Sequence, residues 1–117
     1  MHGMSGLFES LLADLNRQAK WDHIGLWVVV RALRTRGGFN PDELKIVALN
    51  FVRLMLSAGF VAGLSRGNTF EPWTKHDPNE VVERIDKEWT ALGHAPNIGD
   101  IVWFYSPRLL KETFPAS

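Results

Sequence analysis

Four histidines and a few carboxylates are the side chains of this chain that could carry acid–base or metal chemistry. The histidines stand at positions 2, 23, 76 and 94, too scattered for a helical His-x-x-x-His pair, and no cysteine is present to complete a zinc site. We interpret them as surface or capping residues. Acid–base catalysis needs two groups with separated pKa values in one concave site. Glu83, Glu88 and Asp100 could supply carboxylates, but most acids on an amphipathic helix are simply solvated. We therefore expect no enzyme, no metal and no cofactor.

One short segment, Gly63-Leu64-Ser65-Arg66-Gly67, matches the G-x-S-x-G pattern of serine hydrolases. In those enzymes the serine sits on a sharp turn from a strand to a helix, within a sheet far larger than 117 residues can build. Here the residues that follow favour a strand. The pattern is therefore interpreted as a hairpin loop, and the absence of cysteine removes thiol catalysis as well.

The middle of the chain contains two nearly identical helix starts. Each combines an Asx side chain that can cap the helix, a proline at the first helical position and an acid three residues after the cap, in Asn40-Pro41-Asp42-Glu43 and Asp77-Pro78-Asn79-Glu80. The apolar spacing that follows predicts helices over 41–58 and 78–92. Between them, 60–64 and 69–73 predict a β-hairpin with a four-residue loop, in which Pro72 places the second strand at a sheet edge.

The two ends of the chain show shorter patterns. Apolar residues at helical spacing predict a helix over 6–19 with Ser5 as its cap. Residues 101–105 are apolar enough to predict a strand buried on both faces, and a short helix could follow Ser106-Pro107.

Residues 24–33 fit either a helix or a strand. Arg31 and Arg34 at helical spacing, followed by a glycine pair, favour a helix that Asp22 could cap. The three valines at 28–30 suit a strand equally well, because short apolar runs do not discriminate between the two.

Composition places the chain among globular proteins. Of its 117 residues, 45% are hydrophobic and 22% charged, which is outside the disordered class and close to the commonest size of one domain. We expect residues 1–117 to form one mainly helical α+β domain with a β-hairpin, winged-helix-like in outline. Its core should join the helices over 6–19, 41–58 and 78–92 through Leu11, Phe51, Val52, Ile85 and Trp89.

Neither a secretory signal nor a membrane span is expected. The start, Met1 to Ser5, lacks the cationic and apolar regions of a signal peptide. Apolar runs such as Leu26–Val30 fall far short of the roughly 20 residues that cross a bilayer. A cysteine-free chain is compatible with a reducing compartment, and we expect a cytoplasmic protein.

A winged-helix outline raises the possibility of a DNA-binding regulator, with 41–58 as the recognition helix. The first turn of that helix, which would meet base edges, carries Asp42 and Glu43. A duplex binder neutralises several phosphates, and this chain has a formal net charge of zero. Nucleic acid is therefore not the expected partner, and a DNA-binding regulator, or a degenerate relative of one, is the alternative.

The five tryptophans divide into two groups. Three lie in apolar patterns and are predicted core residues: Trp27, Trp89 and Trp103. Trp21, at a helix junction, and Trp73, beside Pro72 at a strand end, are expected to show an edge to solvent. An exposed tryptophan is a frequent interface anchor. For these two residues we favour a partly covered packing role over that of an anchor.

The last third of the chain resembles a group of known sequences. The run from Val82 to Gly93 (VERIDKEWTALG), continued by Pro96 to Phe104 (PNIGDIVWF), is similar to stretches in small uncharacterised bacterial proteins. Some of these look like immunity proteins encoded beside contact-dependent or polymorphic toxins. The resemblance implies a compact, non-catalytic cytosolic domain that neutralises a toxin by binding it, and it transfers no toxin-contacting residue.

Charge patterning suggests where such a protein could hold a basic toxin domain. Residues 1–67 carry eight Lys/Arg and five Asp/Glu, and residues 68–117 carry five and eight, giving +3 and −3 by subtraction. The candidate surface is an exposed acidic stretch with an aromatic anchor, formed by Glu71, Trp73, Asp77, Glu80, Glu83 and Asp86. Complementary charge would speed encounter with a basic partner. Alternatively, these acids only stabilise a helix amino terminus and keep the protein soluble.

Overall fold

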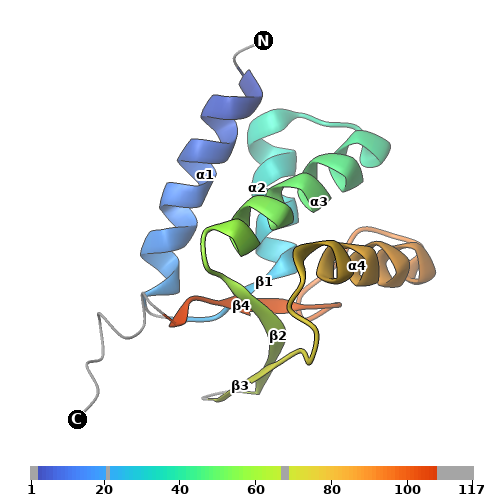
Figure 1. The fold of residues 1–117 in the computed structure, drawn as a ribbon. Helices are drawn as coiled ribbons and strands as arrows, with labels where there is room; N and C mark the ends of the chain where they lie inside the picture. The colour runs from blue at the N-terminus through green and yellow to red at the C-terminus, as the bar shows by residue number, and fades with distance from the viewer. Residues whose placement is uncertain (1–2, 21, 67–68, 108–117) are drawn as a thin grey trace.

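A computed structural model describes residues 3–20, 22–66 and 69–107, which form four helices and one four-stranded antiparallel sheet (Figure 1). The elements in chain order are α1 (Gly3–Ala19), β1 (Ile24–Gly25), α2 (Leu26–Gly37), α3 (Pro41–Ser57), β2 (Val61–Arg66), β3 (Thr69–Pro72), α4 (Pro78–Leu92) and β4 (Trp103–Tyr105). The predicted class, a mainly helical α+β domain with a hairpin, is confirmed.

The two predicted helix starts are both present, but they differ in detail. At α3 the Asn40 side chain accepts from the Glu43 N–H at 2.9 Å, and the Glu43 carboxylate accepts from the Asn40 N–H at 3.1 Å, which completes a capping box. At α4 the Asp77 carboxylate accepts from the N–H groups of Asn79 and Glu80 at 3.1 and 3.2 Å. There the Glu80 carboxylate faces Lys75 at 3.8 Å instead of returning to the cap.

The predicted caps of the first two helices are wrong. Helix α1 begins at Gly3, so Ser5 lies inside its first turn. The Asp22 carboxylate accepts from the neighbouring His23 N–H at 2.7 Å, and the residue before α2 is Gly25. The Asp22 side chain is thus used in a local turn and does not cap α2.

The ambiguous segment 24–33 contains both kinds of structure. Ile24 and Gly25 pair with β4, and the helix starts at Leu26. A Cβ atom at position 25 would lie 2.6 Å from the Trp27 ring, so glycine lets that ring pack against the strand. The helix stops where Gly38 adopts φ +64°, a left-handed conformation that glycine accepts readily.

The sheet has the order β1-β4-β2-β3, so β3 is an edge strand, as Pro72 predicts. The first hairpin strand extends two residues further toward the loop than predicted, because β2 reaches Arg66, which pairs with Thr69, whereas β3 begins at Thr69 as predicted. Strand β4 is shorter than predicted and only Phe104 in it is buried. Trp103 and Tyr105 are half-buried, because they alternate to the opposite face of the strand. The helix expected after Ser106-Pro107 lies outside the described residues.

All the helices gather on one side of the sheet, and the core lies between these layers (Figure 1). Ile24, Ala62 and Phe104 occupy one row across three strands and are buried. The core residues expected from the helices are also buried: Leu11, Phe51, Val52, Ile85 and Trp89. Among the described residues, no helix combines the length and the apolar character needed to span a membrane.

Candidate functional site

Three of the predicted acids, Glu80, Glu83 and Asp86, lie along the solvent side of α4 and each faces a cation; we call them the acidic row. Glu80 is 3.8 Å from the Lys75 ammonium, and Glu83 is 3.4 Å from that of Lys87, one turn further along the helix. Asp86 lies 2.7 Å from Lys45 of α3. These side chains are half or more exposed, so the row is accessible while its charge is locally balanced.

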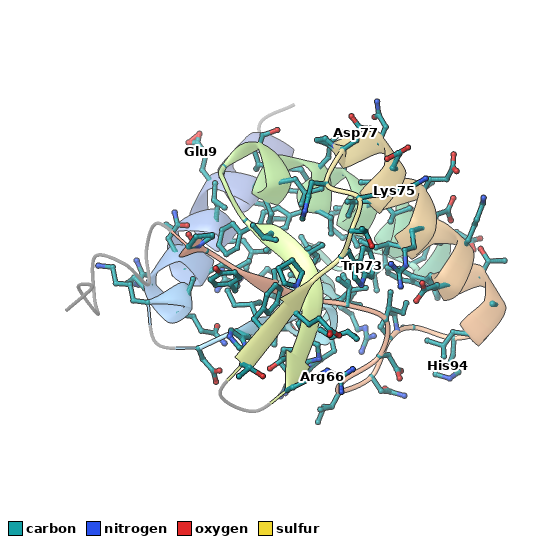
Figure 2. All side chains as sticks on the ribbon, turned by 60° about the horizontal axis from the view of Figure 1, so that its bottom comes forward. Glu9, Arg66, Trp73, Lys75, Asp77 and His94 are labelled. Carbon is teal, nitrogen blue, oxygen red and sulfur yellow. The ribbon has the colours of Figure 1, made fainter. Side chains whose placement is uncertain are left out.

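The other two predicted acids lie near the amino end of α4 and on the hairpin. Asp77 caps α4 as described, and its carboxylate is used by two backbone donors. Glu71 in β3 is 3.3 Å from the Arg66 guanidinium of β2 across the hairpin. Figure 2 shows Trp73, Lys75 and Asp77 following one another along the connection from β3 into α4. The predicted acids therefore come from one continuous segment of the chain, β3, the connection that follows it and α4.

Trp73 is buried, so the prediction that it shows an edge to solvent is wrong. It is 6% exposed, its backbone N–H donates to the Ala62 carbonyl at 2.9 Å, and the Arg84 guanidinium lies 3.7 Å from its ring centroid. Arg84 of α4 thus covers a face of the Trp73 ring that a binding partner could otherwise contact. A shallow groove of about 810 Å³ remains between this tryptophan and the charged side chains of α4.

The other tryptophans follow the predictions only in part. Trp89 is buried, as predicted, whereas Trp27 and Trp103 are half-buried. Trp21 lies outside the described residues. Trp73, the aromatic anchor that the sequence suggested for this surface, is therefore not available to a partner.

Lys45 and Arg53, the cations of α3 that a recognition helix would use to contact DNA, instead contact side chains of α4. Lys45 donates to the Thr90 hydroxyl at 2.7 Å, in addition to its ion pair with Asp86. Arg53, two turns further along α3, donates to the Asn79 side chain. Helix α4 packs alongside α3 (Figure 1), so these two cations serve the contact between the helices.

A second surface was not predicted and lies around the carboxyl ends of α2 and α4. Two grooves, of about 770 and 500 Å³, meet there at Arg34. Ile46 borders the first and is 62% exposed, and Ile98 borders the second and is 74% exposed. Ile46 could have been found from the sequence, because it is an isoleucine outside the apolar series of its helix.

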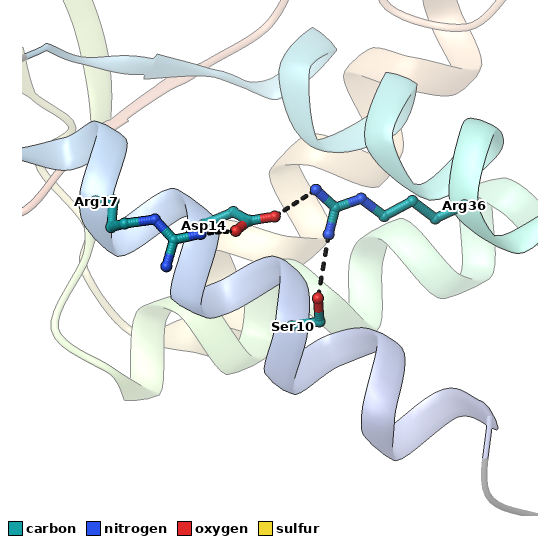
Figure 3. A network of polar contacts seen from close by, with 4 residues as sticks. All are labelled: Ser10, Asp14, Arg17 and Arg36. Atoms are coloured by element: carbon teal, nitrogen blue, oxygen red, sulfur yellow. Dashed lines mark hydrogen bonds and ion pairs between the residues drawn. The ribbon is translucent and has the colours of Figure 1, made fainter.

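This basic groove, as we call the surface around Arg31, Arg34, Ile46 and Ile98, carries guanidinium groups without acidic partners. Both arginines are exposed, and in the described part of the chain neither side chain has an ion pair or hydrogen bond. Arg36, on the same helix, is used differently, because it donates to Asp14 of α1 (Figure 3).

The Asp14 network ties α1 to α2. Its carboxylate accepts from Arg36 and from Arg17, and Arg36 also donates to Ser10 at 3.4 Å. The hydrogen bond from Arg36, together with the positive charges of Arg36 and Arg17, lowers the pKa of Asp14 below its ordinary value of 3.8.

A serine–histidine pair is present but lacks the third group of a catalytic triad. The His23 Nδ1 atom lies 2.7 Å from the Ser65 hydroxyl, although neither sequence pattern linked the two residues. Asp22 binds the backbone N–H of His23, and among the described residues no carboxylate is hydrogen-bonded to its ring. The rings of Phe70 and Tyr105 lie 5.1 and 6.0 Å from that of His23. The pair belongs to an aromatic cluster on the sheet.

Across residues 3–20, 22–66 and 69–107, no three His, Asp or Glu side chains gather as metal ligands. The chain matches no family model, no curated protein and no solved structure.

Proposed function

We propose that this chain is a protein-binding domain that neutralises a bacterial toxin by direct contact and performs no reaction itself. The observation that supports binding most is the exposure of Ile46 and Ile98, at 62% and 74%, on the borders of adjoining grooves. Single exposed isoleucines are ordinary, but two beside grooves and unpaired arginines are typical of a surface that another protein covers.

The toxin-neutralising form of the proposal rests on the resemblance of residues 82–93 and 96–104 to small bacterial proteins, some of which look like immunity proteins. The acidic row on α4 is compatible with a basic toxin domain. Each of its exposed ion pairs contributes only about 0–1 kcal/mol, so a partner's arginine could replace a local lysine at little cost. Carboxylates there would also steer a cationic domain toward the surface.

Co-expression tests the proposal. The chain should rescue growth of cells that produce the toxin encoded beside its own gene, and the two purified proteins should elute as one complex in size-exclusion chromatography. Replacing Ile46 and Ile98 together with aspartate should weaken the complex, because a buried unpaired charge opposes association. Leu64→Asp is the matched control, since Leu64 is 37% exposed and lies on the hairpin. If the chain neither rescues growth nor forms a complex with the toxin, the proposal is refuted.

A DNA-binding regulator remains the second candidate because the helices followed by a two-stranded wing have the outline of such proteins. The contacts of Lys45 and Arg53 with α4 oppose it, since both would have to be broken before either cation could reach a phosphate.

A further inference from the structure

The basic groove is a place where positive charge exceeds negative charge. Asp42 also lines its first part, but in the described part of the chain it forms no ion pair with Arg31 or Arg34. Arg17 and Arg36 share Asp14, and Lys45 has Asp86, whereas Arg31 and Arg34 have no such acid in the described part of the chain. Both arginines stand on α2, three residues apart, so their side chains emerge about one helical turn from each other.

Apolar surface lies next to these charges. Leu44 and Trp89 line the first groove beneath the exposed Ile46, and Ile98 stands at the border of the second groove. A ligand that fills these grooves must therefore be apolar on one side and negatively charged on the side that meets α2.

We propose that the basic groove binds an acidic amphipathic helix of a protein partner, an inference that rests on the proposed protein-binding function. Carboxylates three or four residues apart on a helix lie one turn apart and match the spacing of Arg31 and Arg34, which can each hold a carboxylate with two hydrogen bonds. The apolar face of that helix packs on Ile46 and Ile98. Nucleic acid fits less well, because a site for it neutralises several phosphates. Here only Arg31 and Arg34 offer unpaired positive charge, and the acid Asp42 lines the first groove.

A designed peptide probe tests this inference on the full chain. The probe is a fluorescein-labelled amphipathic helix of about four turns, with leucines on one face and glutamates on the other, and its counterpart has lysines in place of the glutamates. Fluorescence anisotropy should show binding of the glutamate peptide alone. The double change Arg31→Glu and Arg34→Glu should weaken that binding by about tenfold or more, because it replaces attraction with repulsion.

The matched control reverses two cations elsewhere, Arg66→Glu and Lys75→Glu, whose side chains are 64% and 76% exposed. It should bind the glutamate peptide as the unaltered chain does. Circular dichroism of both variants establishes that they fold. No binding of the glutamate peptide, equal binding of the lysine peptide, or an equal loss in the control would overturn the inference. So would a single-stranded DNA oligomer that binds with the same dependence on Arg31 and Arg34.

Failure here is distinguishable from failure of the proposed function. If the chain neutralises its neighbouring toxin while the glutamate peptide does not bind, the proposed function stands and the occupant assigned to the basic groove is wrong. If neither the toxin nor the peptide binds, both are wrong.

Discussion

Asp14 joins the first two helices and is the carboxylate whose ionisation most clearly favours the fold. Its hydrogen bond with Arg36 and the charges of Arg36 and Arg17 lower its pKa from 3.8. A pKa lower in the folded than in the unfolded chain means that the ionised group stabilises the fold above the unfolded pKa. This contribution is lost as the pH falls through the folded pKa.

Asp14→Asn should therefore lower the melting temperature at pH 7, and the difference from the unaltered chain should shrink as the pH falls below the ordinary pKa of 3.8 and through the lowered pKa of the folded chain. Thermal unfolding followed by circular dichroism across this range measures it. Glu9→Gln, on the same helix, is the control, because Glu9 has no ion pair in the described part of the chain. A difference that grows toward acid pH would contradict the stabilising role of ionised Asp14.

Trp73 shows why a local pattern misplaced a candidate anchor. A proline neighbour and a strand end are features of exposed positions, but Arg84 lies eleven positions along the chain and only the packing of α4 places it over the ring. We predict that Trp73→Ala lowers the free energy of unfolding by about 3–5 kcal/mol, as large aromatic truncations in cores do.

Arg84→Ala should lower the free energy of unfolding by about 0.5–1 kcal/mol, since it removes a partly exposed cation–π contact. Urea unfolding measures both, and a neutral Trp73→Ala would contradict the burial of this ring.

Helix ends and strand pairings differ in how far the sequence predicts them. The caps at Asn40 and Asp77 could be predicted because cap and donor lie within three residues of each other. The pairing of Ile24 with Phe104 joins residues from opposite ends of the chain, and nothing local encodes it. A two-residue strand such as β1 also carries too short a pattern to separate it from the helix that follows.

The contact between α3 and α4 leads to a prediction about DNA. Binding to duplex should be weak and independent of sequence at physiological salt, because Lys45 and Arg53 contact α4 and the acids of the α3 first turn oppose phosphate. Gel-shift titration with random duplexes of equal length measures this. Tight, selective binding to one operator, abolished by Lys45→Ala and Arg53→Ala, would instead establish the regulator.

Across the chain, the exposed acids could be predicted but the basic groove could not. Helical spacing alone places Glu80 and Glu83 on the solvent side of α4. The cations that face the acidic row could be predicted only in part. Lys87, which faces Glu83, is on the same helix, whereas Lys45, which faces Asp86, comes from α3. The basic groove gathers residues from three separate segments, and only the packed structure brings them together. The separation of charge between the two parts of the sequence therefore does not describe the surface, because local ion pairs cancel much of it.

The acidic row on α4 should contribute to the rate at which a basic partner binds. Changing Glu80, Glu83 and Asp86 together to lysine should leave the fold nearly intact, because these positions lie off the apolar face of α4. It should slow association with a basic partner markedly, since each new lysine stands beside Lys75, Lys87 or Lys45 and turns a balanced surface cationic. Stopped-flow or surface plasmon resonance with the co-purified toxin gives the on-rate, which should also fall as salt rises for the unaltered chain. Single changes are a poor test, because one exposed pair contributes only about 0–1 kcal/mol.

The variant with Arg31→Glu and Arg34→Glu is the comparison, because it adds negative charge to the basic groove instead of positive charge to the acidic row. An on-rate that the triple change leaves unaltered and the arginine change reduces would remove the acidic row from the mechanism and assign recognition to the basic groove.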